Sequence, residues 1–203
     1  MKKNSACKIL ASVTAAAYLV VAFPVASSAQ SVDDLAQVCA GCHGEKGVPV
    51  DKTTPVIWGQ KRDYILNQLY DFKVGRRAND LMTPIAQSLS KEDMQALATH
   101  FSKMAWPDLP ATTPSADDAK TAREVLNSVN CRGCHQANYE GDTVRPRIAG
   151  QQDEYLLKTM NDFRNGDRKT YIGMTALMKS VHEEALKPVA EYLASLKVPA
   201  QKK

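Results

Sequence analysis

Residues 39–43 read Cys-Ala-Gly-Cys-His and residues 131–135 read Cys-Arg-Gly-Cys-His, so the C-x-x-C-H pattern occurs twice in this chain. Two thiols three positions apart on a helical turn can each add to one vinyl group of a haem, and the adjacent histidine then points its imidazole at the iron. A redox dithiol does not need that histidine, and a zinc site built from both pairs would need them far closer in the sequence than they are. The pattern predicts two covalently bound haem c groups. The attachment residues are Cys39, Cys42, Cys131 and Cys134, and the iron ligands on this side are His43 and His135.

An internal repeat extends well beyond the two motifs. The offset of 92 that superposes them also carries Met-Thr at 82–83 onto Met-Thr at 174–175. An offset of 91 carries Pro-Val-Ile-Trp-Gly-Gln at 55–60 onto Pro-Arg-Ile-Ala-Gly-Gln at 146–151. Self-similarity at a fixed offset indicates repeated structural units. We infer a tandem duplication with one haem in each half.

The second axial ligand of each iron separates an electron carrier from a catalyst. A haem held by His and Met is closed to substrates and has a raised potential. The spacing from His43 to Met82 is identical to the spacing from His135 to Met174. Met178 is the rival in the second half, but its counterpart in the first half is an alanine, and a methionine is ordinarily core filling. The repeat therefore predicts Met82 and Met174 as the axial ligands.

The segment 1–29 has the order of a secretory signal. Three lysines without an acid precede an apolar run at 9–23, and small residues end the segment at 27–29. The run is shorter than the ~20 residues that span a bilayer, so we predict cleavage after Ala29 and export to the periplasm, with an uncleaved anchor as the alternative. Cleavage lowers Lys plus Arg from 26 to 23 against 22 acids, which reduces the net charge from +4 to +1. A nucleic-acid partner is not expected, because such binding needs a strong cationic excess.

The chain divides into four segments. After the signal at 1–29 comes a first haem-binding unit at 30–106, then a proline-rich linker at 107–117, then a second unit at 118–203. Units of this size are marginal for a purely hydrophobic core. A covalently held haem would supply the missing apolar centre of each unit.

Both units show the same order of helices, and neither contains a convincing strand. One helix leads into the haem motif, an amphipathic helix follows the proline segment, and a final helix follows the methionine. The expected fold class is therefore all-α. The expected helices include residues 32–39, 63–74 and 118–129, with a start box at Ser90 and Asp93, C-terminal caps at Gly75 and Gly166, and a late or bent start at Pro188.

The repeated order of these elements resembles the two-haem cytochrome c4 family over residues 32–196. The resemblance implies two tandem class I cytochrome c domains related by a pseudo-twofold axis. It also implies that the carbonyls of Pro55 and Pro146 accept a hydrogen bond from the outer imidazole nitrogen of His43 and His135, which would fix the orientation of each ring.

The family resemblance implies a soluble or peripherally membrane-associated carrier that transfers electrons by an outer-sphere route and is not itself an enzyme. Its expected redox partners are a membrane oxidase, a cytochrome bc complex or a periplasmic dehydrogenase. One alternative is the electron-accepting subunit of a dehydrogenase acting on thiosulfate, sulfide or an alcohol. Another is a dihaem enzyme, against which the doubled His/Met spacing argues. Two repeated arginines, Arg77 and Arg168, are expected either to face haem propionates or to lie solvated at helix ends.

Overall fold

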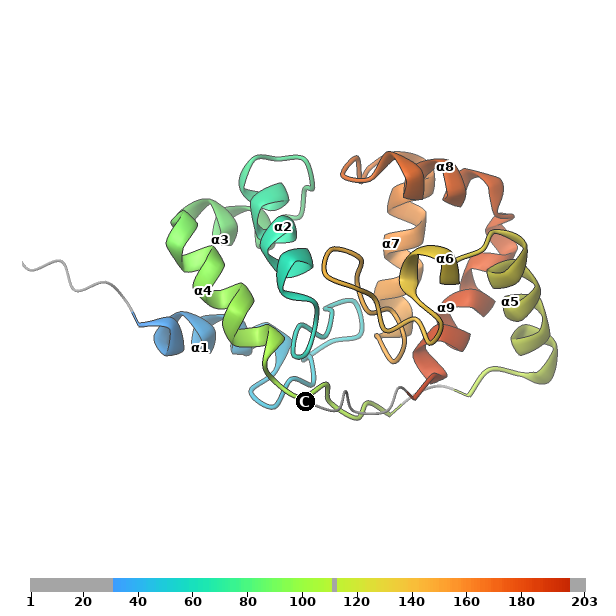
Figure 1. Cartoon of the computed structure of the whole chain (residues 1–203), viewed down its shortest axis with the longest axis horizontal. Helices are drawn as coiled ribbons and strands as arrows, with labels where there is room; N and C mark the ends of the chain where they lie inside the picture. Colours follow the sequence, from blue (N-terminus) through green and yellow to red (C-terminus); the bar gives the residue numbers. More distant parts are fainter. Residues whose placement is uncertain (1–30, 111–112, 198–203) are drawn as a thin grey trace, which may run out of the picture.

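The computed structural model describes residues 31–110 and 113–197, and all the regular structure in this part is helical. The all-α prediction is therefore confirmed for the described residues. Two helical halves lie side by side, with α1 to α4 in one and α5 to α9 in the other (Figure 1). The predicted signal at 1–29 lies outside the described residues. Within the described ranges, the helices lack the length and apolar character needed to cross a bilayer.

In the first half α1 and α2 pack against α4, and α3 packs against α2. The α4 side chains Leu97 and Phe101 are buried together with Ile65 of α2 and Ala36 of α1. Ser90 and Asp93 form the predicted capping box, in which each side chain accepts a hydrogen bond from the backbone of the other residue. The helices are α1 (Val32–His43), α2 (Arg62–Lys73), α3 (Met82–Ser88) and α4 (Lys91–Ser102).

The second half is built around its last helix, α9, against which α5 and α7 both pack. Leu126 of α5, Phe163 of α7 and Leu193 of α9 belong to its buried core. This core is separate from that of the first half, so each half has an apolar centre of its own. The elements are α5 (Ala116–Ser128), α6 (Arg132–His135), α7 (Asp153–Asn165), α8 (Ile172–Ser180), the 3-10 helix η1 (Glu183–Ala185) and α9 (Leu186–Ser195).

The two haem motifs differ in how they connect to the helix that precedes them. In the first half α1 continues through the motif to His43 rather than ending at residue 39. In the second half α5 ends at Ser128, and the motif forms the separate short helix α6, because Asn130 between them has a left-handed φ of 51°. The helix expected at 118–129 starts two residues earlier, at Ala116, because the Ser115 side chain caps it.

The expected helix ends are largely present. Pro188 occupies the third position of α9, and η1 precedes that helix, so the regular helix starts late as predicted. Gly166 is the C-cap of α7, with a left-handed φ of 81°. The prediction for Gly75 was displaced by one position, since Val74 is the C-cap of α2 and Gly75 follows it with a φ of 74°.

Replacing Leu126 with alanine should destabilise the second half. Leu126 is 2% exposed in the core between α5 and α9, so the change removes buried methyl groups and leaves a cavity that costs about 2–5 kcal/mol. Urea unfolding of the haem-loaded protein, followed by circular dichroism, measures this cost. The exposed Glu124 on the same helix provides the control, because Glu124→Ala should change stability by less than ~0.5 kcal/mol. Equal effects of the two substitutions would contradict the packing described.

Candidate haem sites

The cysteines of both motifs are available for covalent attachment. Cys39 and Cys42 lie on the last turns of α1, whereas Cys131 and Cys134 lie at α6. In each pair the first thiol is half-buried and the second is exposed, and none of the four forms a disulfide. Burial raises the pKa of the Cys39 and Cys131 thiols to about 11, which leaves them protonated at neutral pH.

The histidines of both motifs are buried and held in one orientation. His43 Nδ1 lies 2.8 Å from the carbonyl oxygen of Pro55, and His135 Nδ1 lies 3.0 Å from that of Pro146. These are the two contacts implied by the family resemblance. Each imidazole is only 7% exposed, and burial lowers the pKa of both histidines, against the opposite effect of the carbonyl contact. A neutral imidazole that donates from Nδ1 keeps Nε2 free to bind a metal.

The candidate methionine ligands lie at equivalent places in the two halves. Met82 is the first residue of α3, and its N–H donates to Asn79 Oδ1 at 2.9 Å. Met174 lies in the first turn of α8. Both are half-exposed, whereas Met178, the rival in the second half, is 4% exposed within the hydrophobic core. Met94 and Met160 are likewise buried, as expected for core-filling methionines.

Taken together, these residues fit two haem c groups. Each half offers a pair of thiols on one helix segment, an oriented neutral imidazole and a half-exposed thioether. Among the residues described, no three His, Cys, Asp or Glu side chains cluster in a way that could hold a bare metal ion. The donor set therefore suits a macrocycle that brings its own iron and needs only axial ligands from the protein.

The prediction that Arg77 and Arg168 lie solvated at helix ends is wrong, because both side chains reach across the boundary between the halves. Arg77 Nη2 donates to the hydroxyl of Tyr155 at 3.1 Å, and Arg168 Nη2 donates to that of Tyr64 at 3.1 Å. Both guanidinium groups also donate to Gln68 Oε1, at 2.9 and 2.6 Å. Arg168 is only 3% exposed. The network thus places two positive charges at the interface, with the Arg168 charge fully buried.

Two glutamines, which the sequence pattern repeated without revealing their role, also cross between the halves. Gln151 Oε1 accepts from the N–H of Val56 at 2.8 Å, and Gln151 Nε2 donates to the carbonyl of Val56 at 3.0 Å. Gln60 makes the same pair of bonds with the backbone of Arg147, at 2.8 and 2.9 Å. Because positions 56 and 60 correspond to 147 and 151 in the repeat, the contacts obey the pseudo-twofold relation. The repetition of the glutamine was the one sequence signal for this role. It could not reveal the partner, because the partner lies in the other half.

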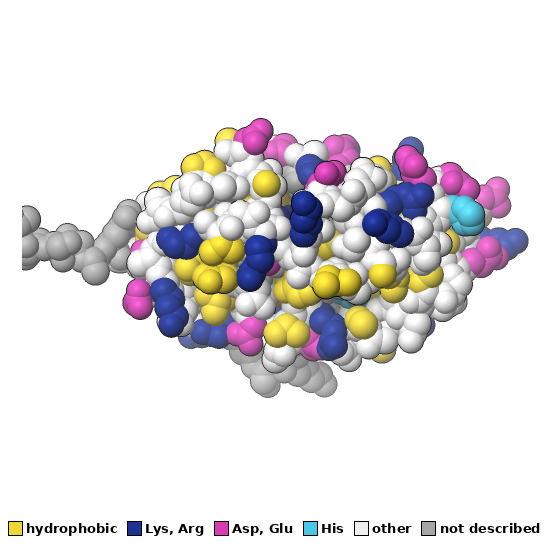
Figure 2. Space-filling view, turned by 90° about the horizontal axis from the view of Figure 1, so that it is seen from above, with side chains coloured by type: hydrophobic (Ala, Val, Ile, Leu, Met, Phe, Trp, Pro, Cys, Tyr) yellow, Lys and Arg dark blue, Asp and Glu magenta, His cyan; other side chains and the backbone are white. Residues whose placement is uncertain are grey.

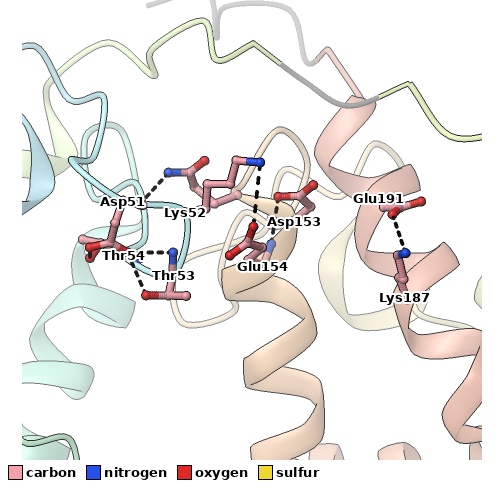
Figure 3. Close-up of polar contacts among 9 residues, drawn as sticks. Asp51, Lys52, Thr53, Thr54, Asp153, Glu154, Lys187 and Glu191 are labelled. Carbon is pink, nitrogen blue, oxygen red and sulfur yellow. Dashed lines mark hydrogen bonds and ion pairs between the residues drawn. The ribbon is translucent and has the colours of Figure 1, made fainter.

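A loop contact adds to this interface. The backbone N–H of Tyr155, near the start of α7, donates to the carbonyl of Lys52 at 3.1 Å. Lys52 Nζ lies 3.7 Å from Glu154 Oε1, and Lys52 belongs to the loop in which Asp51 accepts hydrogen bonds from Thr53 and Thr54 (Figure 3). The segment after the first haem motif is therefore joined to the first turn of α7.

The fold and the paired sites define a dihaem protein built from two class I cytochrome c domains. Residues 119–197 match the Cytochrome c family. Cytochrome c4 of Azotobacter vinelandii is 31% identical over 162 residues, which cover 72% of this chain and 76% of the relative. The thiosulfate dehydrogenase electron acceptor of Stutzerimonas stutzeri is 33% identical over 172 residues, covering 79% and 80%. This chain belongs to the cytochrome c4 family.

A solved structure agrees with this assignment. Cytochrome c4 of Acidithiobacillus ferrooxidans superposes with a TM-score of 0.71 at 28% identity, over 79% of this chain and 99% of that chain. The thiosulfate dehydrogenase TsdBA of Marichromatium purpuratum superposes with a TM-score of 0.69 at 26% identity, over 78% of this chain but 36% of that one. The protein described here is accordingly an electron-transfer protein that carries two covalently bound haem c groups.

Replacing Gln136, the residue directly after His135, with glycine should stabilise the protein. Gly44 follows His43 with a φ of 88°, and a Cβ there would overlap the carbonyl of Val48. Its counterpart Gln136 follows His135 with a φ of 68° and a ψ of 170°, a region that costs a non-glycine residue about 1–3 kcal/mol. Gln136→Gly should raise the free energy of unfolding in urea by about 1 kcal/mol or more. Gln136→Ala keeps the strain, so an equal gain from alanine would refute the explanation.

Proposed function

We propose that this protein is a periplasmic carrier that takes electrons from a dehydrogenase or a respiratory donor and passes them to a terminal acceptor such as an oxidase. The observation that carries the proposal is the doubled ligand set, in which an oriented histidine and a half-exposed methionine recur at the same spacing in both halves. The signal-like composition of the segment 1–29 supports export.

In this proposal His43 and Met82 ligate one iron, and His135 and Met174 ligate the other. Haem supplies one-electron chemistry when both axial positions are filled by protein. The carbonyls of Pro55 and Pro146 keep each imidazole aimed at its iron. A methionine ligand from Met82 or Met174 would leave no open position for a substrate and would raise the potential, so the two sites suit electron transfer.

Apolar side chains beside the methionines support docking of a redox partner at this end of each half. Leu81 is 69% exposed next to Met82, and Ile172 is 85% exposed shortly before Met174. On the face seen from above in Figure 2, hydrophobic side chains gather on both halves, with lysine and arginine side chains between them. Figure 2 also shows acidic side chains on this face, mainly toward its edges. Exposed apolar side chains with charged side chains around them fit transient contact with a redox protein.

A second candidate function is that of the electron-accepting cytochrome of one dehydrogenase. It is favoured by the Stutzerimonas stutzeri relative described as a thiosulfate dehydrogenase electron acceptor. A cytochrome subunit of sulfide dehydrogenase from Chlorobaculum tepidum is also similar, with 33% identity over 88 residues. Reduction of the purified protein by thiosulfate dehydrogenase plus thiosulfate would select this function. Rapid oxidation by a membrane oxidase, without such reduction, would select the general carrier.

Substituting the two candidate methionines should remove the charge-transfer band from Met sulfur to ferric iron in equal steps. The oxidised protein should contain two haems per chain, both with this band. Met82→Ala and Met174→Ala should each remove about half of its intensity, and the double variant all of it, because each thioether would serve one iron. Absorbance, normalised to haem content, measures the loss.

Met178→Leu is the matched control, since Met178 lies one helical turn beyond Met174 but is buried in the core. It should leave the band unchanged. A loss on changing Met178, or a band worth only one haem in the unsubstituted protein, would overturn the proposed ligand set. Ready cyanide binding by one haem would favour the dihaem enzyme instead.

A further inference from the structure

The two crossing glutamines contact the peptide groups that orient the histidines of the opposite half. The Pro55 carbonyl, which accepts from His43 Nδ1, and the Val56 N–H, which donates to Gln151 Oε1, belong to one peptide unit. Gln151 is in the second half, whereas His43 is in the first. A continuous path of two hydrogen bonds therefore leads from Gln151 to the imidazole of the other half.

The same path exists in the reverse direction. His135 Nδ1 contacts the Pro146 carbonyl at 3.0 Å, and the N–H of the same peptide unit, on Arg147, donates to Gln60 Oε1 at 2.8 Å. The amide nitrogen of each glutamine also donates to the carbonyl of the same residue, so Val56 and Arg147 are each held at both the N–H and the carbonyl. The arrangement is thus reciprocal, with each half holding the histidine support of the other.

Burial makes these contacts rigid. Gln60 and Gln151 are 4% and 3% exposed, and Val56 is 1% exposed. Each Oε1 also accepts from the N–H of the following residue, at 2.9 Å in both halves, which fixes the side-chain amide from its own side. Hydrogen bonds in such a dry environment polarise one another, so a bond at the N–H of a peptide strengthens acceptance at its carbonyl.

We propose that Gln60 and Gln151 are positioning residues that act across the interface, each setting the orientation and basicity of the candidate axial histidine in the opposite half. This inference rests on the proposed ligation by His43 and His135. Acceptance from the N–H of Val56 makes the Pro55 oxygen a stronger acceptor for His43. A more electron-rich imidazole stabilises the ferric state, because outer hydrogen bonds raise ligand basicity. Loss of Gln151 therefore raises the reduction potential of the first haem, and loss of Gln60 raises that of the second.

The test is to measure each haem potential separately in Gln151→Leu and Gln60→Leu, with the full haem-loaded chain. Haem methyl signals in the NMR spectrum of the oxidised protein are assigned to each half through contacts with its own residues, and their shifts are followed during a redox titration. Gln151→Leu should raise only the potential of the haem at Cys39 and Cys42, by a few-fold change in the reduction equilibrium. Gln60→Leu should raise only that of the haem at Cys131 and Cys134.

Gln152 provides the matched control. It is a glutamine next to Gln151, and its Nε2 also donates across the interface, to the carbonyl of Asp51 at 3.0 Å. This hydrogen bond does not involve the peptide unit between Pro55 and Val56. Gln152→Leu should leave both potentials unchanged. A shift in the half that carries the substitution, an equal shift of both haems, or no shift in either leucine variant would overturn the proposal.

A conservative variant covers the case in which leucine prevents folding. Gln151→Glu keeps an oxygen acceptor for the Val56 N–H in either protonation state, so the potential of the first haem should not rise. The role of the acceptor oxygen would be contradicted if Gln151→Glu raised the potential of the first haem as much as a folded Gln151→Leu protein does. A rise in Gln151→Glu but not in Gln151→Leu would contradict it as well.

Failure of the underlying ligand assignment would give a different result. If His43 and His135 were not ligands, the unsubstituted protein would lack the low-spin signals of two His/Met haems. If the ligand assignment holds but the glutamine inference fails, those signals persist in every variant and the potentials show no crossed pattern.

Discussion

A hydrogen bond from each buried imidazole to a proline carbonyl constrains the path of the chain in both halves. A histidine that is 7% exposed must satisfy Nδ1 inside the protein if Nε2 is to remain free for iron. The chain must therefore return from the haem motif to a carbonyl 11 or 12 positions later. The positive φ angles at Gly44 and Gln136 begin that return directly after the histidine. The loop geometry thus follows from the need to orient one ring.

The same proline segments form much of the boundary between the halves, which couples the sites to the interface. The boundary includes buried amide, guanidinium and phenol groups, from Gln60, Gln151, Arg168 and Tyr64 among others. Within the described part of the chain, no buried side-chain nitrogen or oxygen lacks a hydrogen-bond partner. A fully satisfied polar network specifies one relative arrangement of its parts, because any slip leaves buried groups unpaired. Small cytochrome units are thereby held in one mutual orientation.

Much of the fold and of the candidate site followed from spacing alone. The helices, the absence of strands in the described residues and the core positions of Met94 and Met160 follow from local periodicity. The preference for Met174 over Met178 rests on the repeat and stays a prediction; Met178 itself is buried in the core. The break at Asn130 was not predicted, because a left-handed residue other than glycine carries only a weak sequence signal.

Local patterns in the sequence are enough to predict the number of haem attachment sites, the residues available to hold each group and the helical class of the fold. Covalent attachment and helical periodicity both depend on residues close together in the chain. The contacts of four other side chains become visible only in the folded protein, since each meets a partner in the other half: Arg77, Arg168, Gln60 and Gln151. Their repetition shows only that they occupy corresponding positions in the two halves. Their partners lie 78 to 104 positions away, and no local pattern encodes a contact whose geometry depends on how two folded units pack.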